Sequence, residues 1–204
     1  VSASVNEEFN YTGGHGNIDH SPEIRLCGAR SVDGEPAILC GSAGFSGVWA
    51  PENTRVAIFV GIARKEPFGT SGPRSRVRFF GGWGYADGLA KDKKFVEKAY
   101  KGGVPMGGDL PPKPEKAKAP RFAFWALKDP NSGNLDRIQV IKGWYDQRGY
   151  GFQKIYNVAW SDGRKLDDQG NLPAVGNTVD IAKARYTNTI GDNELSAVWT
   201  DPAF

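Results

Sequence analysis

The organisation of the chain is decided by the stretch from Glu66 to Tyr85, EPFGTSGPRSRVRFFGGWGY. It joins the strongest helix pattern in the sequence to the first of a series of strands, through a turn rich in Gly, Ser and Pro. The residues before it and after it differ in pattern. We therefore interpret the stretch as a seam between the tail of one domain, residues 1–68, and a second domain, residues 69–204.

The helix before the seam is unusually apolar. Its first apolar stripe has helical spacing and consists of Val56, Phe59, Val60 and Ala63. Either Pro51 opens the helix, or Asn53 or Thr54 caps a later start, and Lys65 and Glu66 end it before Pro67. Ile58 and Ile62 add a second stripe, so the helix is expected to be covered on more than half of its circumference.

Residues 1–47 are expected to be irregular, apart from a short strand near 37–40. Within them, His15, Asp19 and His20 could bind a divalent metal from one loop. A polar loop without a chemical role is the favoured interpretation, because such a loop lacks the rigid surroundings that hold metal ligands in place.

Two cysteines, Cys27 and Cys40, lie in the same segment with 12 residues between them. A disulfide is the favoured interpretation and would stabilise the fold by about 3 kcal/mol, while two free thiols stay open as the alternative and metal binding is least favoured. A bonded pair would indicate an oxidising compartment, hence a periplasmic or secreted protein.

After the seam the pattern is one of short strands and turns. Strands are predicted at 74–80, 121–128, 137–144, 152–160, 178–181, 185–190 and 194–200. A second helix is predicted to follow Asp92 and to stop at Gly102 and Gly103, before an exposed Gly-, Pro- and Lys-rich connector near 102–120. The predicted fold class is mainly β, α+β by content: an antiparallel β-sandwich-like domain with two short helices, preceded by an irregular segment.

The charge balance argues against nucleic acid as a partner. The sequence has 26 Lys and Arg against 23 Asp and Glu, a dispersed net charge of +3. No run approaches the roughly 20 apolar residues that span a bilayer, so membrane insertion is not expected.

The seam itself contains a candidate substrate or anion contact. Thr70 and Ser71 lie between glycines, and Arg74 follows closely, so backbone N–H groups and a guanidinium could surround an anion. A plain helix-to-strand turn is the favoured alternative, since the residues do not form a phosphate-binding loop motif.

Two further groups of residues suggest binding. Asp162, Asp167 and Asp168 could bind calcium, but they lack EF-hand spacing and are better interpreted as solvated turn residues. Tryptophans could form a platform for sugar rings, yet strand faces make burial the expectation for Trp125, Trp144, Trp160 and Trp199. No motif for a catalytic triad, a zinc hydrolase or a dinucleotide-binding fold occurs, and no catalytic residue is identified.

A series of phrases resembles the C-terminal part of a bacterial family of large proteins of unknown function. In order along the chain they are GVWA at 47–50, ENTR at 52–55, TSGPR at 70–74, VRFFGGW at 77–83, GVPMGGDL at 103–110, NLDRIQ at 134–139, VGNTVD at 175–180, YTNTIG at 186–191 and AVWTDP at 197–202. The N-terminal part of longer members resembles the PHP (polymerase and histidinol phosphatase) metal-dependent hydrolases, with His-x-His and Asp-x-His metal motifs that this sequence lacks.

The resemblance implies that the chain is a fragment cut at both ends and is inactive alone. It would be the accessory or structural portion of a metal-dependent hydrolase, with no cofactor of its own and any divalent metal bound elsewhere in the parent protein. Its partner would be the rest of that parent, and its exposed apolar helix surface could also form a homodimer. The alternative is a polymer- or glycan-binding β-sandwich module without a catalytic role.

Overall fold

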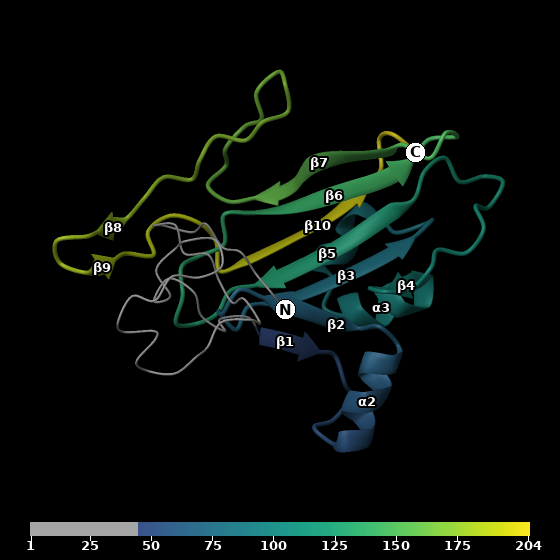
Figure 1. Cartoon of the computed structure of the whole chain (residues 1–204), viewed down its shortest axis with the longest axis horizontal. Coiled ribbons are helices and arrows are strands. Elements are labelled where there is room, and N and C mark those ends of the chain that lie inside the picture. The colour runs from purple at the N-terminus through teal and green to yellow at the C-terminus, as the bar shows by residue number, and fades with distance from the viewer. Residues whose placement is uncertain (1–44) are drawn as a thin grey trace. The chain divides into compact units, whose positions relative to one another are not determined.

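The computed structural model describes residues 45–204 (Figure 1). Contacts divide the chain into two compact units, Val1–Arg74 and Ser75–Phe204, which we call unit 1 and unit 2. The predictions for five residues lie outside the described part: His15, Asp19, His20, Cys27 and Cys40.

In unit 1, two short strands flank the apolar helix. Strands β1 (Phe45–Val48) and β2 (Pro67–Thr70) pair antiparallel, and helix α2 (Arg55–Ala63) lies between them in the chain. These strands were not predicted: 45–47 was assigned to irregular structure, and the turn at 69–72 begins as strand. Four residues are too few to show an alternating pattern, and pairing across an intervening helix leaves no local signal.

Hydrogen bonds explain where α2 begins and where it ends. The hydroxyl of Thr54 accepts a hydrogen bond from the Ala57 N–H at 3.2 Å, so the later of the two predicted starts is correct. At the other end, the N–H groups of Lys65 and Glu66 bond to the carbonyls of Ile62 and Gly61. This is a Schellman motif, with Lys65 at φ 60° in the position that glycine usually takes.

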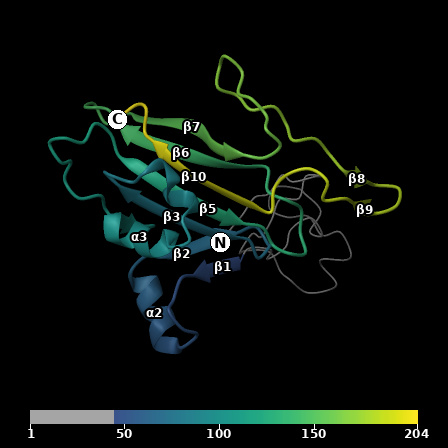
Figure 2. The ribbon, with the colours of Figure 1, turned by 180° about the vertical axis from the view of Figure 1, so that it is seen from behind.

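Unit 2 is built on a four-stranded antiparallel sheet with the order β10-β5-β3-β4 (Figures 1 and 2). Its strands are β3 (Arg76–Gly82), β4 (Gly103–Pro105), β5 (Arg121–Leu127) and β10 (Glu194–Thr200). Strand β5 lies between β10 and β3, a central position that its apolar residues on both faces explain.

One face of this sheet holds the buried core. Helix α3 (Phe95–Gly102) and the short 3-10 helix η2 (Asp87–Lys91) supply side chains that pack with Phe80 and Ala123 of the sheet. The rings of Phe80 and Phe95 meet edge to face at 5.6 Å. Asp92 lies in the turn before α3. The hydrogen bonds that its carboxylate accepts from the Lys98 ammonium and from the Lys94 N–H lower its pKa.

Two glycines of the seam lie inside β3 rather than after it. A Cβ on Gly82 would lie 2.7 Å from the carbonyl oxygen of Gly102, and one on Gly103 would lie 2.1 Å from that of Gly81. The strand therefore runs through to Gly82, because only glycines allow the junction of α3 and β4 to come this close.

A long hairpin, β6 (Arg137–Tyr145) and β7 (Gly151–Trp160), lies alongside β10 in Figures 1 and 2. It meets the sheet on the face opposite α3, where Tyr156 of β7 contacts Trp199 of β10 at 5.1 Å between ring centroids. A second, two-residue pairing joins β8 (Val179–Asp180) to β9 (Arg185–Tyr186). The predicted class, mainly β with antiparallel sheets, is confirmed, and residues 45–204 contain two α-helices, α2 and α3.

Candidate functional site

One face of the β6–β7 hairpin gathers aromatic and basic side chains. Three cross-strand pairs follow one another along it, Val140 opposite Tyr156, Lys142 opposite Lys154, and Trp144 opposite Phe152. Because side chains alternate along a strand, these three pairs share one side of the hairpin. We call five of these residues the aromatic–lysine face: Lys142, Trp144, Phe152, Lys154 and Tyr156.

The sheet covers only part of this face. Tyr156 packs on Trp199, and the Lys142 ammonium lies 2.6 Å from the carboxylate of Asp201, just after the last residue of β10. Trp144 and Phe152 lie farther along the hairpin than Lys142 and Lys154, beyond the point where β10 ends. The aromatic–lysine face therefore passes from a covered half to an exposed half.

The exposed half presents a stacked aromatic pair. The rings of Trp144 and Phe152 lie 5.8 Å apart with an angle of 18° between their planes, and the residues are 41% and 46% exposed. The prediction that Trp144 is buried is therefore wrong, because the hairpin extends beyond the end of β10 here. Trp125, Trp160 and Trp199 are partly buried, which is closer to the expectation.

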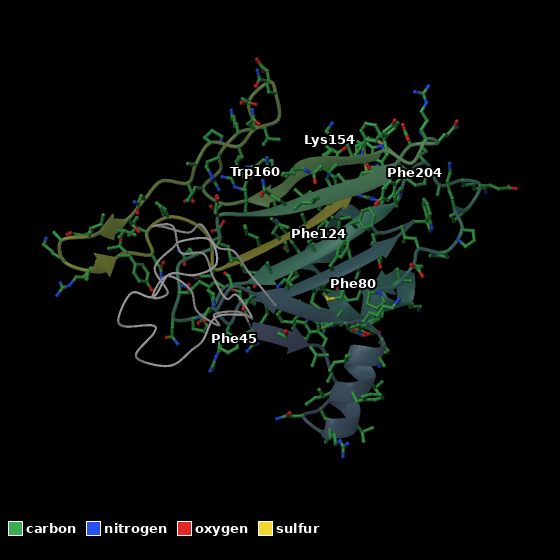
Figure 3. The ribbon with its side chains drawn as sticks, viewed as in Figure 1. Phe45, Phe80, Phe124, Lys154, Trp160 and Phe204 are labelled. Atoms are coloured by element: carbon green, nitrogen blue, oxygen red, sulfur yellow. The ribbon has the colours of Figure 1, made fainter. Side chains whose placement is uncertain are left out.

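Lysines accompany these rings. The Nζ of Lys142 lies 5.8 Å from the ring centroid of Trp144, and that of Lys154 lies 5.0 Å from the ring centroid of Tyr156 (Lys154 is labelled in Figure 3). Such distances allow cation–π attraction. Sequence reasoning missed both lysines; their signal is a position two residues from an aromatic on the same strand, which places both on one face.

Hydrogen bonds hold the turn of the hairpin. The Oδ1 of Asp146 accepts hydrogen bonds from the backbone N–H groups of Arg148 and Tyr150, both at 2.9 Å, and Gly149 takes a positive φ of 82°. The backbone N–H of Asp146 also bonds to the Tyr150 carbonyl. These bonds fix the two strand ends that carry Trp144 and Phe152.

A second aromatic cluster lies near the C-terminal residue of unit 2. The Lys142 ammonium also donates to the Ala203 carbonyl at 2.7 Å, and the next residue, Phe204, meets Trp83 edge to face at 5.5 Å. Lys113 lies over the Phe204 ring at 5.8 Å. Lysine and aromatic side chains thus recur together at this end of unit 2.

Two of the three acidic residues considered for calcium, Asp162 and Asp167, stabilise turns. Asp162 interacts with Ser161 and accepts a hydrogen bond from the Gly191 N–H, and Asp167 accepts from the N–H groups of Asn171 and Gln169; these bonds lower both pKa values. Among residues 45–204, no three His, Cys, Asp or Glu side chains form a group suited to a metal ion.

The structure keeps Thr70, Ser71 and Arg74 close only as neighbours in one bend. The hydroxyl of Thr70 accepts the N–H of Gly72 at 3.4 Å, so that N–H is turned toward a protein oxygen. Gly72 has a φ of 137°, which a glycine tolerates. An anion contact at these residues stays a prediction.

Helix α2 presents an apolar surface in unit 1. Val56 is 71% exposed and Phe59 is 69% exposed, and Val60 and Ile62 are exposed as well. Only two small residues of the helix, Ala57 and Gly61, are buried. The expected cover is therefore not supplied by the residues described.

In the described part of the chain, every helix is too short or too polar to cross a membrane. No curated protein and no solved structure matches the sequence. A family model does match it, over residues 1–204, with the description "Protein of unknown function (DUF3604)". Since that match extends over the full sequence given, the chain belongs to the DUF3604 family of proteins of unknown function.

Proposed function

We propose that unit 2 is a polysaccharide-binding module. The observation that carries this proposal is the exposed, stacked pair of Trp144 and Phe152 on a hairpin with a fixed turn. Aromatic rings offer flat apolar surfaces that complement the C–H faces of sugar rings, and they lose little conformational entropy on binding. A solvent-facing aromatic pair rimmed by charged groups is typical of an interaction site.

Retardation of the chain in native gels containing soluble polysaccharides tests this proposal. We expect at least one polysaccharide to retard it, and we expect Trp144→Ala and Phe152→Ala each to weaken that retardation about tenfold or more, as loss of a central aromatic contact does. Phe45→Ala is the matched control, since Phe45 is an exposed aromatic residue of unit 1. Equal loss in all three variants, or no retardation in any gel, would refute the proposal.

A second candidate function is supported by α2 and by the family resemblance. In this proposal the chain is the accessory portion of a larger, periplasmic or secreted PHP-like metal-dependent hydrolase, whose metal ligands and catalytic residues lie elsewhere in the parent. The apolar surface of Val56 and Phe59 is the kind of surface that packs against another part of a protein.

This second candidate is tested in the full-length parent. A chelator-sensitive phosphoester hydrolysis is expected there and not in the present chain. Phe59→Asp is expected to lower the melting temperature of the parent while leaving that of the isolated chain within about 2 °C, because a surface substitution usually has little effect. Activity of the isolated chain, or an equal effect of Phe59→Asp in both proteins, would contradict the assignment.

A further inference from the structure

The pairing of Lys142 with Lys154 is the least expected feature of the aromatic–lysine face. The two lysines lie directly opposite each other on adjacent strands. Like charges in this position repel and destabilise a hairpin. A neutral polar or an acidic side chain at either position would avoid this repulsion. The contacts of each lysine therefore decide whether its charge is compensated within the protein.

Lys142 is largely neutralised by the protein. Its ammonium lies 2.6 Å from the Oδ2 of Asp201 and donates to the Ala203 carbonyl at 2.7 Å. The Asp201 carboxylate is only 6% exposed, so the pair is partly sheltered from solvent screening. Lys142 therefore ties the hairpin to the segment that follows β10.

Lys154 differs from Lys142 in its surroundings among residues 45–204. Its ammonium lies over Tyr156, and no carboxylate of residues 45–204 lies within 4.0 Å of it. The acid nearest in sequence on the hairpin, Asp146, is occupied by the N–H groups of Arg148 and Tyr150. Lys154 thus gives the aromatic–lysine face a positive charge that no carboxylate of residues 45–204 compensates.

The distance between this charge and the aromatic pair suits a sugar polymer. Lys154 and Phe152 are two residues apart on β7 and point to the same side, a separation of about 7 Å along the strand. A sugar ring stacked on Trp144 or Phe152 would place an acidic substituent, or that of the next sugar, within reach of the flexible Lys154 side chain.

We propose that the polymer bound by this face is an anionic polysaccharide, with Lys154 contacting its carboxylate or sulfate groups and the Trp144–Phe152 pair contacting its sugar rings. The proposal rests on the polysaccharide-binding function proposed above. A nucleic acid fits less well, because its continuous phosphate charge is matched by a track of several cations, whereas this face offers one uncompensated lysine.

Three gel series separate the sources of charge: polygalacturonate carries carboxylates, dextran sulfate carries sulfates, and dextran is neutral. We expect one or both anionic polymers to retard the chain and dextran not to. Retardation should weaken when the salt concentration rises from 20 to 300 mM, since exposed charge pairs are screened.

Two charge-matched variants isolate Lys154. We expect Lys154→Met to weaken binding to the anionic polymer about tenfold, with unchanged circular dichroism. Lys101→Met removes the same charge from an exposed residue of α3, on the other face of the sheet, and should bind as the unmodified chain does.

The outcomes distinguish this inference from the function on which it rests. If dextran binds as well as the charged polymers and Trp144→Ala abolishes that binding, the anionic inference is wrong while polysaccharide binding stands. Equal weakening by Lys154→Met and Lys101→Met would also overturn the inference. If no polysaccharide binds, both proposals fail, and tighter binding of oligothymidylate through Trp144 and Lys154 would replace them with a nucleic-acid site.

Discussion

The two α-helices of residues 45–204 have almost the same length and opposite surroundings. Helix α3 has eight residues, buries Phe95 and Ala99 against the sheet of unit 2, and turns residues such as Lys101 to solvent. Helix α2 has nine residues, is apolar on most of its circumference, and buries only Ala57 and Gly61. Helices this short depend on tertiary packing. The apolar side of α3 is therefore covered within unit 2, whereas α2 offers an apolar surface for a further contact.

Paired phenylalanine truncations should give the largest contrast between the two helices. Phe80 is 1% exposed and contacts Phe95 and Tyr100 of α3. Phe80→Ala should therefore lower the unfolding free energy by about 3–5 kcal/mol. Phe59→Ala in α2 should cost about 0.5 kcal/mol or less. Urea unfolding followed by tryptophan fluorescence measures both free energies. Equal losses would show that α2 is packed as closely as α3.

The junction of α3 with β4 should tolerate no side chain. Gly103→Ala places a methyl group against the Gly81 backbone carbonyl and the Tyr85 hydroxyl, so we expect a loss of about 1–3 kcal/mol. Gly84→Ala is the matched control, because a Cβ there has no neighbour within 4 Å. Similar urea midpoints for the two variants would mean that this junction is looser than the structure shows.

The contact of Tyr85 with α3 should make stability depend on alkaline pH. Its hydroxyl donates to the Ala99 carbonyl at 2.7 Å, and burial raises its pKa from 10.0 to about 12. A raised pKa means that the folded state favours the neutral phenol, so this contribution is complete below pH 10 and is lost as the pH rises toward 12.

Unfolding free energies of the unmodified chain and of Tyr85→Phe at pH 8, 10 and 11.5 measure this effect. The difference in unfolding free energy between the two proteins should be constant below pH 10. Above pH 10 the unmodified chain should lose stability relative to Tyr85→Phe. A difference that does not change with pH would show that the phenol is less buried than the structure places it.

The cap of α2 should have a smaller, local effect. Thr54→Ala removes the acceptor of the Ala57 N–H and should cost about 1 kcal/mol, seen as roughly fivefold faster hydrogen exchange of the α2 amides. Thr54→Ser keeps the acceptor and should exchange as the unmodified chain does. Unchanged exchange of α2 in Thr54→Ala would mean that contacts other than the cap hold this helix.

The sequence predicts those parts of the fold whose signal is local and long enough. The seven-residue strand β5 has apolar side chains on both faces and is central, and the long strands β6 and β7 lie where their apolar patterns placed them. Thr54 was one of the expected caps of α2. In each case the deciding residues are neighbours in the sequence.

Features that depend on distant residues escaped prediction. Pairing of β1 with β2 joins strands on either side of a helix, and the glycines of β3 are explained only by the approach of Gly102 and Gly103. The exposure of Trp144 depends on where β10 ends, more than fifty residues later in the chain. The aromatic–lysine face could therefore not be located from the pattern of one strand.

The central claim, that the aromatic–lysine face binds an acidic sugar polymer, is tested most directly by an NMR titration with oligogalacturonate. We expect amide and side-chain signals of Trp144, Phe152 and Lys154 to shift together and to saturate, while signals of α2 and α3 stay in place. Saturating shifts confined to α2, or signals of the β6–β7 hairpin that do not move with either oligogalacturonate or a sulfated oligosaccharide, would contradict it.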